Sequence, residues 1–205
     1  DDMLDGKENF TVSAYAKLDK GITEGNHTIF SNGWDNAGGL SFGFSSNEWM
    51  YLCADVTGGE WLAFNLKSST SDSNFSSYDW HNYTLSLEDG KILKVYIDGK
   101  LTFSNTFTEK MNTVNPDSVF NIGGTYNGGY HLAGSVDEVK VLCRTLTVEE
   151  IAELIKFDEP EEQSDLVALY DFDDFGKVGY DSCGNYPLSV NEFAKSTISS
   201  KTDGQ

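Results

Sequence analysis

A period of two in the hydrophobic pattern constrains the fold of this chain more than any other feature. Apolar residues share one parity along residues 10–18, and the same alternation recurs along residues 40–44 and 93–97. Because successive side chains of a β-strand point to opposite faces of a sheet, this pattern predicts strands with one buried and one polar face.

Turn dipeptides that tolerate a positive φ angle separate these segments: Asp89-Gly90, Asp98-Gly99 and Asn127-Gly128. Such pairs favour the two-residue turns of β-hairpins, so residues 85–103 are predicted to form three antiparallel strands. We expect about ten or eleven strands in the first 142 residues, a spacing typical of an all-β, two-sheet antiparallel sandwich.

One short helix is expected near residues 147–156. Thr147 and Glu150 have the spacing of a capping box, in which each side chain bonds the other residue's backbone amide. Ile151, Leu154 and Ile155 follow as one apolar stripe, long enough to dock a helix on the sandwich.

The remainder of the chain divides into three segments. Residues 157–165 form an acidic linker, and residues 166–190 contain an apolar strand followed by the turn-like sequence DSCGN at 181–185. Residues 191–205 are predicted to be a polar tail.

Charge excludes one class of partner. The chain has 14 basic and 33 acidic residues, a formal net charge of −19, and Arg144 is its single arginine. Such a chain repels phosphate backbones and anionic lipid surfaces, so we expect no nucleic-acid partner. No apolar stretch is long enough to span a bilayer, so no membrane insertion is expected.

A set of motifs in fixed order resembles a known family. The motifs are Trp80-His81-Asn82-Tyr83, VYIDGKL at 95–101, FNIGG at 120–124 and GSVDEVKVLCRTLTVEEIAEL at 134–154. Together they resemble laminin-G-like, concanavalin A-like jelly-roll domains, which are common accessory modules of secreted bacterial proteins. The resemblance implies a jelly-roll sandwich over residues 1–156.

The order of the C-terminal motifs departs from that family. Its members usually begin with a strand like LVALYDFDD and an acidic turn, whereas here both follow the helix. Residues 166–190 either complete this sandwich, in cis or in a strand-exchanged dimer, or begin a tandem second copy. We favour completion, because a missing strand would leave a long open sheet edge.

A structural calcium ion is the expected cofactor. Asp137 shares the parity of Val139 and Val141, which predicts a carboxylate that points into the interior. Aspartates at equivalent positions of the resembled family often hold calcium, and the turn with Asp181 and Asn185 offers further oxygen ligands. The alternative is that Asp137 accepts backbone hydrogen bonds from a neighbouring loop.

Two aromatic loops are the candidate ligand-binding site. One contains Trp34, Asp35 and Asn36, and the other contains Tyr126, Asn127, Tyr130 and His131. Sugar rings combine apolar faces with a rim of hydroxyl groups, so aromatic rings beside amides and carboxylates suit them. The alternative is that each aromatic residue packs within its loop or in the core.

We therefore predict a non-catalytic module of a secreted or cell-surface protein that binds a glycan or glycoprotein as a monomer or strand-exchanged dimer. No catalytic residues are predicted, because the chain lacks the alternating acidic residues of related glucan hydrolases and the common hydrolase motifs. The alternatives are an adhesin domain that recognises a host or matrix protein and a structural spacer beside a glycosidase.

Overall fold

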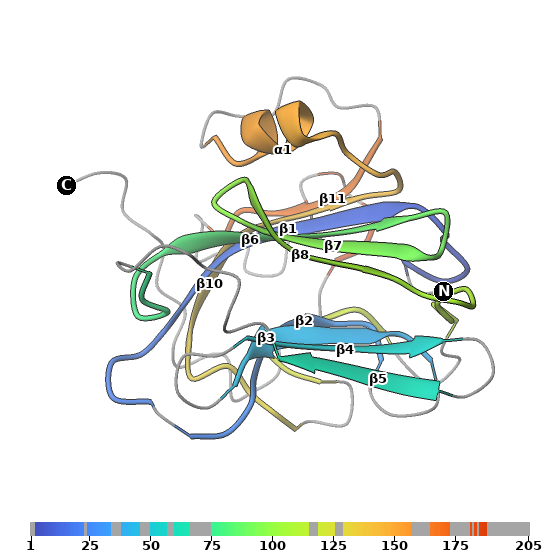
Figure 1. Ribbon diagram of the computed structural model, residues 1–205. Helices are drawn as coiled ribbons and strands as arrows, with labels where there is room; N and C mark the ends of the chain where they lie inside the picture. The colour runs from blue at the N-terminus through green and yellow to red at the C-terminus, as the bar shows by residue number, and fades with distance from the viewer. Residues whose placement is uncertain are drawn as a thin grey trace.

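The computed structural model describes residues 3–22, 24–33, 38–45, 50–56, 60–65, 75–114, 119–125, 129–156, 165–172, 181, 183 and 185–187. Within these ranges the chain forms two antiparallel sheets packed face to face, with one helix on the outside (Figure 1). The predicted all-β, two-sheet jelly-roll sandwich with a single short helix is confirmed.

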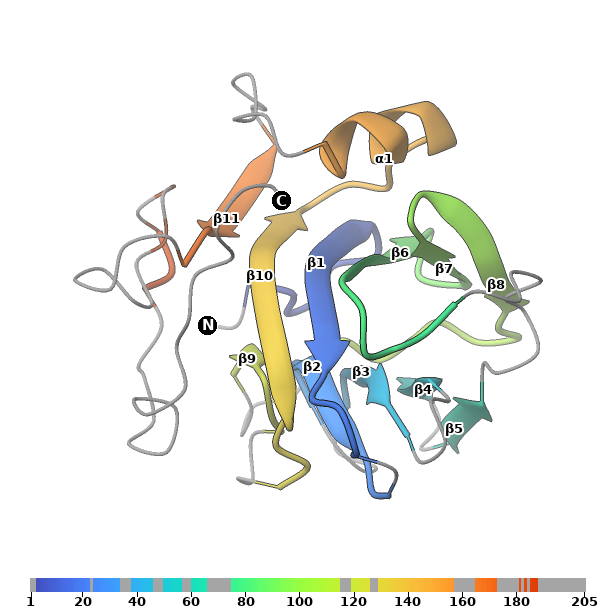
Figure 2. The ribbon, with the colours of Figure 1, turned by 90° about the vertical axis from the view of Figure 1, so that its left-hand side faces the viewer.

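The larger sheet has six strands in the order β11-β10-β1-β6-β7-β8. They are β1 (Phe10–Leu18), β6 (His81–Glu88), β7 (Ile92–Ile97), β8 (Lys100–Thr106), β10 (Gly134–Leu142) and β11 (Leu166–Tyr170). The smaller sheet has the order β5-β4-β3-β2-β9. Its strands are β2 (His27–Ser31), β3 (Leu40–Phe44), β4 (Met50–Val56), β5 (Glu60–Asn65) and β9 (Asn121–Ile122). Figure 2 shows β11, β10 and β1 side by side in the larger sheet.

The core lies between the sheets and uses the parity that the alternation predicts. Val12 and Leu85 of the larger sheet and Phe42 of the smaller sheet are each 0% exposed. Tyr83 meets Phe44 edge to face, with ring centroids 5.3 Å apart. The outward parity carries polar residues such as Ser13 and Thr84 on the larger sheet.

The two predicted hairpin turns are present. Asp89 and Gly90 have φ angles of 52° and 69°, and Asp98 and Gly99 have φ angles of 49° and 74°. These paired positive values match the right-handed twist of the flanking strands, which explains why Asp-Gly occurs at both positions.

The helix α1 (Val148–Leu154) begins with the predicted capping box. The Thr147 side chain accepts from the amide of Glu150, and the Glu150 carboxylate accepts from the amide of Thr147. Ile151 and Leu154 are buried against the outer face of the larger sheet. Among the described residues no helix is long and apolar enough to cross a membrane.

Strand β11 lies at the edge of the larger sheet beside β10. The ladder joins Val139 to Tyr170 and Lys140 to Leu169. Ala168 and Tyr170 are 0% exposed and belong to the main core cluster. In this structure the C-terminal strand therefore contributes to the sandwich of its own chain.

A β-bulge at Glu138 changes which way Asp137 points. Ser13 pairs with Lys140 whereas Tyr15 pairs with Asp137, so β10 has one extra residue between them. Glu138 occupies that position with a φ angle of 51°. Residues that pair across strands share a face, so Asp137 lies on the helix side with Tyr15. The prediction that Asp137 points into the interior is wrong, because the bulge breaks the parity with Val139.

Candidate functional site

Only part of the predicted ligand-binding set lies within the described residues. Trp34, Asp35, Asn36, Tyr126 and Asn127 lie outside them, so their role stays a prediction. Tyr130 and His131 are described, and both are exposed. They belong to what we call the Tyr130 loop, which comprises residues 123–125 and 129–132.

Tyr130 presents its ring from a fixed but unfavourable backbone conformation. Its φ angle is 48°, in the left-handed region that a bulky side chain rarely adopts, and it is 42% exposed. The backbone amide of Thr28 donates to the carbonyl oxygen of Tyr130 at 2.9 Å. Backbone strain of this kind persists where surrounding contacts impose it and is concentrated at ligand-binding sites.

Further hydrogen bonds attach the Tyr130 loop to β2. The amide of Gly123 donates to the carbonyl of Ile29, and the Ser31 hydroxyl donates to the carbonyl of Gly124 at 3.0 Å. The amide of Leu132 donates to the carbonyl of Gly123 at 2.9 Å. The loop is therefore anchored on both sides of Tyr130, so its aromatic ring is presented at low entropic cost.

His27 joins the Tyr130 loop to the turn before β2. Its Nδ1 lies 3.0 Å from the carbonyl oxygen of His131, and its Nε2 lies 3.0 Å from the carbonyl oxygen of Glu24. The ring of His131 lies against Gly124, where an added Cβ would be 3.4 Å from its Nδ1. The sequence predictions gave His27 no role, and its position at the first residue of β2 carried no signal for one.

The outer face of the smaller sheet, next to this loop, carries hydroxyl groups. The phenol of Tyr51 lies 2.6 Å from the Thr28 hydroxyl and 3.0 Å from the Ser41 hydroxyl. Burial raises the pKa of Tyr51 to about 12, and the neighbouring Tyr130 adds to this shift. Thr28, Ser41 and Tyr51 are 0%, 0% and 6% exposed, so these hydroxyl groups form a buried network that supports the strands beside Tyr130.

Asp55 of β4 is a buried carboxylate that the sequence predictions omitted. It is 1% exposed, and its Oδ2 accepts from the Asn112 side chain at 3.1 Å. Within the described part of the chain, its Oδ1 has no hydrogen-bond partner. A buried acceptor without a partner costs free energy, so this oxygen is a candidate contact for a polar group. A signal existed, because Asp55 is the single charged residue of the strand sequence MYLCADV.

His81 is fixed by a structural ion pair. Its Nδ1 lies 2.7 Å from Asp98 Oδ2, while Asp98 Oδ1 accepts from the amide of Asn82 at 2.9 Å. The hydrogen bond that His81 donates to the Asp98 carboxylate raises the pKa of His81 above its usual value. Because these contacts tie the β7–β8 turn to the start of β6, they account for His81 without a catalytic role.

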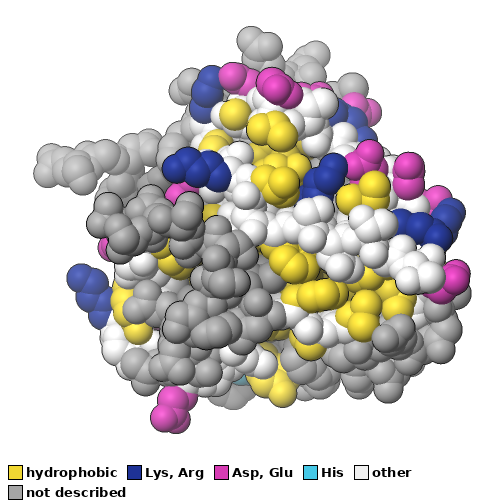
Figure 3. Space-filling model, in the orientation of Figure 1, with side chains coloured by type: hydrophobic (Ala, Val, Ile, Leu, Met, Phe, Trp, Pro, Cys, Tyr) yellow, Lys and Arg dark blue, Asp and Glu magenta, His cyan; other side chains and the backbone are white. Residues whose placement is uncertain are grey.

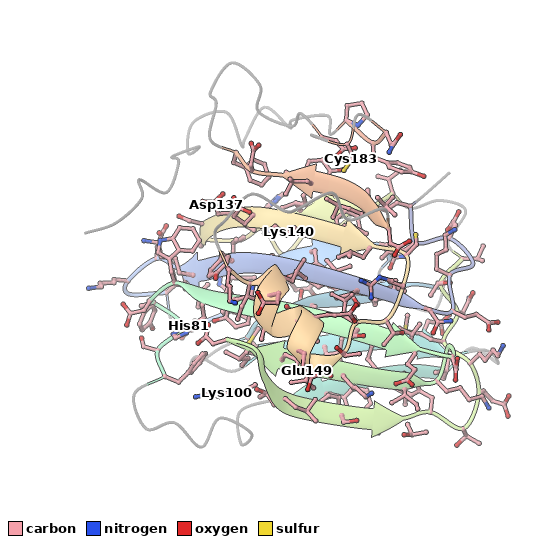
Figure 4. All side chains as sticks on the ribbon, turned by 90° about the horizontal axis from the view of Figure 1, so that it is seen from above. His81, Lys100, Asp137, Lys140, Glu149 and Cys183 are labelled. Carbon is pink, nitrogen blue, oxygen red and sulfur yellow. The ribbon has the colours of Figure 1, made fainter. Side chains whose placement is uncertain are left out.

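The predicted calcium ligands do not form one site. Asp137 faces the helix side of β10, and its Oδ1 accepts from the amide of Glu138 at 2.9 Å. Asp181 contacts the opposite side of β11, where its carboxylate accepts from backbone amides. Figure 4 shows Asp137 on β10, whereas Cys183 lies beyond β11. The backbone amide of Cys183 donates a hydrogen bond to Asp181.

These three residues therefore do not fit a shared calcium ion. No cluster of three or more His, Cys, Asp or Glu side chains in the described part of the chain could hold a metal. The residue assignment for the metal is corrected on this geometry, and calcium dependence itself stays a prediction that a binding measurement must decide.

Solved structures similar to this one include binding domains of two proteins and one domain of an extracellular enzyme. The binding domain of botulinum neurotoxin serotype D aligns with a TM-score of 0.57 and 15% identity, covering 75% of this chain and 37% of that chain. Domain 4 of AbnA, an extracellular arabinanase of Geobacillus stearothermophilus, aligns with a TM-score of 0.54 and 20% identity, covering 73% and 68%. The binding domain of Paraclostridial Mosquitocidal Protein 1 aligns with a TM-score of 0.53 and 19% identity, covering 72% and 36%. At these identities the likeness establishes the fold.

A laminin-G sequence model described as "Concanavalin A-like lectin/glucanases superfamily" matches residues 1–152. The match includes β1 to β10 and the start of α1, and it agrees with the two-sheet sandwich and with the resemblance of the sequence motifs. The chain therefore belongs to the concanavalin A-like lectin/glucanases superfamily.

Proposed function

We propose that this chain is a non-catalytic module that binds an uncharged glycan at the Tyr130 loop. The observation that carries the proposal is Tyr130 itself: an exposed aromatic ring in a strained conformation, anchored through Thr28. An aromatic platform stacks on the apolar face of a sugar ring, while polar groups beside such a platform form hydrogen bonds with its hydroxyl rim.

The charge of the chain restricts the class of glycan. A net charge of −19 opposes the approach of sulfated or uronate-rich polysaccharides. Beside the loop, the hydroxyl groups of Thr28, Ser41 and Tyr51 are buried and bond one another, so they add no positive charge that could attract an anionic sugar. Neutral oligosaccharides are therefore the favoured ligands, and the arabinanase domain in complex with arabinotriose provides a precedent on the same fold.

Secretion and attachment to a larger protein complete this proposal. The similar structures include domains of toxins and of an extracellular enzyme. A module of this kind would concentrate its parent protein on a glycan or glycoprotein surface. The chain would act as a monomer or as a strand-exchanged dimer.

A protein ligand is the second candidate, favoured by an apolar area at the open side of the sandwich. Figure 3 shows hydrophobic side chains on the face where the edge strands β5 and β8 lie. Leu101 of β8 is 54% exposed and pairs with Tyr96 on the helix side of the sheet. Phe103 lies on the core side of the same strand, and its ring centroid is 5.1 Å from that of the partly buried Phe64. Large exposed apolar patches are typical of protein-binding surfaces.

An array of neutral, sialylated and sulfated glycans separates the two candidates. We expect the protein to bind a subset of the neutral glycans and to leave the sulfated ones unbound at low salt. A failure to bind any glycan, together with capture of a protein ligand that Leu101→Ala weakens, would overturn the glycan proposal.

A further inference from the structure

The carboxylate of Asp181 is surrounded by four backbone amides. Its Oδ1 accepts from the amides of Leu169 and Cys183, and its Oδ2 accepts from the amides of Asn185 and Tyr186. All four donor–acceptor distances are 2.9 Å. Two donors at each oxygen form a complete set for a carboxylate that is 1% exposed.

These bonds join a turn to the free edge of β11. The amide of Leu169 points away from β10, since it donates to Asp181 rather than across the ladder. The Asn185 side chain lies 3.5 Å from the carbonyl oxygen of Val167 on the same edge. The Tyr170 hydroxyl donates to the carbonyl oxygen of Tyr186 at 2.6 Å. Asp181, Cys183, Asn185 and Tyr186 thus form what we call the edge clasp.

The clasp holds a strand on which the core depends. Ala168 and Tyr170 of β11 are 0% exposed and pack with the buried Val139 and Val141 of β10. Strand β11 lies beyond residues 1–152, the part that matches the family. A segment outside the matched part therefore completes the sheet and covers an edge that could otherwise pair with another chain.

The electrostatics of the clasp stabilise the Asp181 carboxylate without a bound metal ion. Burial by itself would raise the pKa of Asp181, but the amides of Leu169, Tyr186, Cys183 and Asn185 hold it below its usual value. Each N–H dipole points its positive end at the carboxylate, which repels a metal ion placed at the same oxygens.

We infer that Asp181 is a metal-independent lock that holds β11 in place and closes this edge of the six-stranded sheet. The lock uses backbone amides at Asp181, where the sequence predicts a calcium ion. The two explanations predict opposite results in one experiment.

The experiment uses the full chain in Cys143→Ser form, so that Cys183 is the partly exposed thiol and Cys53 stays buried. Three quantities are measured in excess calcium and again in excess chelator. They are the melting temperature, the rate of thiol labelling at Cys183 and the hydrogen-exchange rate of the Leu169 amide. Asp181→Asn is compared with Asp137→Asn as the matched control, since both remove one buried carboxylate charge.

We expect calcium and chelator to give the same melting curve and the same protection of the Leu169 amide. In Asp181→Asn the side-chain NH₂ group faces two backbone N–H donors and cannot accept their hydrogen bonds. The substitution should therefore lower the melting temperature by about 10 °C. It should also accelerate Cys183 labelling about tenfold or more, whereas Asp137→Asn should leave the labelling rate unchanged.

Two results would overturn the inference. One is that the Leu169 amide loses its protection from hydrogen exchange in chelator and regains it in calcium. This measurement uses the chain with Asp181 intact, so it decides the question even if Asp181→Asn fails to fold. The other is an Asp181→Asn protein whose melting temperature and Cys183 labelling match those of the parent chain.

Discussion

The phenol of Tyr15 donates a 2.5 Å hydrogen bond to the carbonyl oxygen of Ile155, the C-cap residue that follows α1. Lys140 of β10 donates to the carbonyl oxygen of Leu154 at 3.2 Å. The last carbonyls of a helix have no partner within the helix, so these two side chains satisfy them and fix α1 to the sheet.

Tyr15→Phe should lower the free energy of unfolding by about 0.5–1.5 kcal/mol, because it leaves the carbonyl of Ile155 without this donor. Urea denaturation measures the change. Tyr130→Phe is the control: it removes a hydroxyl from an exposed ring and should stay within about 0.5 kcal/mol of the parent. Equal urea midpoints for the parent and Tyr15→Phe would show that the bond contributes nothing.

Thr147→Ala should destabilise the protein by about 1 kcal/mol, since it removes the side-chain acceptor of the capping box. Thr147→Ser keeps a hydroxyl at the same position and should retain most of the stability. Thermal unfolding distinguishes the two variants. A serine variant as unstable as the alanine variant would contradict a role for the hydroxyl.

Stability should decline at alkaline pH through Tyr51. Its pKa rises from 10.0 to about 12 in the folded state, chiefly because burial disfavours the phenolate. Because the pKa of Tyr51 is higher in the folded state than in the unfolded state, its contribution to the free energy of unfolding is complete below pH 10.0. That contribution is lost as the pH rises toward 12. Melting temperatures measured across this range should fall for the parent chain and fall less for Tyr51→Phe. Parallel pH profiles would contradict this assignment.

Trp34→Ala is expected to weaken ligand binding and to keep the melting temperature within a few degrees, as for an exposed platform. This prediction comes from the sequence, because Trp34 lies outside the described residues. Binding and melting are measured on the same sample. Unfolding of the variant would place Trp34 in the core and move the site elsewhere.

Local patterns predicted those parts of the fold that depend on local physics. The Asp-Gly pairs at 89–90 and 98–99 adopt the positive φ angles expected of hairpin turns, and Thr147 with Glu150 caps α1 as expected. Each of these features needs only a few adjacent residues, which explains why the sequence contains enough information.

The site could be predicted less completely, because it depends on long-range geometry. The bulge at Glu138 depends on how β10 pairs with β1, and no residue of the segment indicates it. The predicted direction of the Asp137 side chain was therefore wrong. The anchor of Tyr130 is an amide of Thr28, about a hundred positions away in the chain. Backbone amides carry no sequence signature, and this also concealed the clasp at Asp181.

The most direct test of the central claim is the binding of three proteins to the same array of neutral glycans: the parent chain, Tyr130→Phe and Tyr130→Ala. Val148→Ala, at an exposed position on α1, is the matched control. Stacking on an aromatic ring contributes about 0.5–1.5 kcal/mol, so Tyr130→Ala should weaken binding by roughly twofold to tenfold. Tyr130→Phe and Val148→Ala should bind like the parent. Equal binding by Tyr130→Ala and the parent chain would contradict a glycan site at the Tyr130 loop.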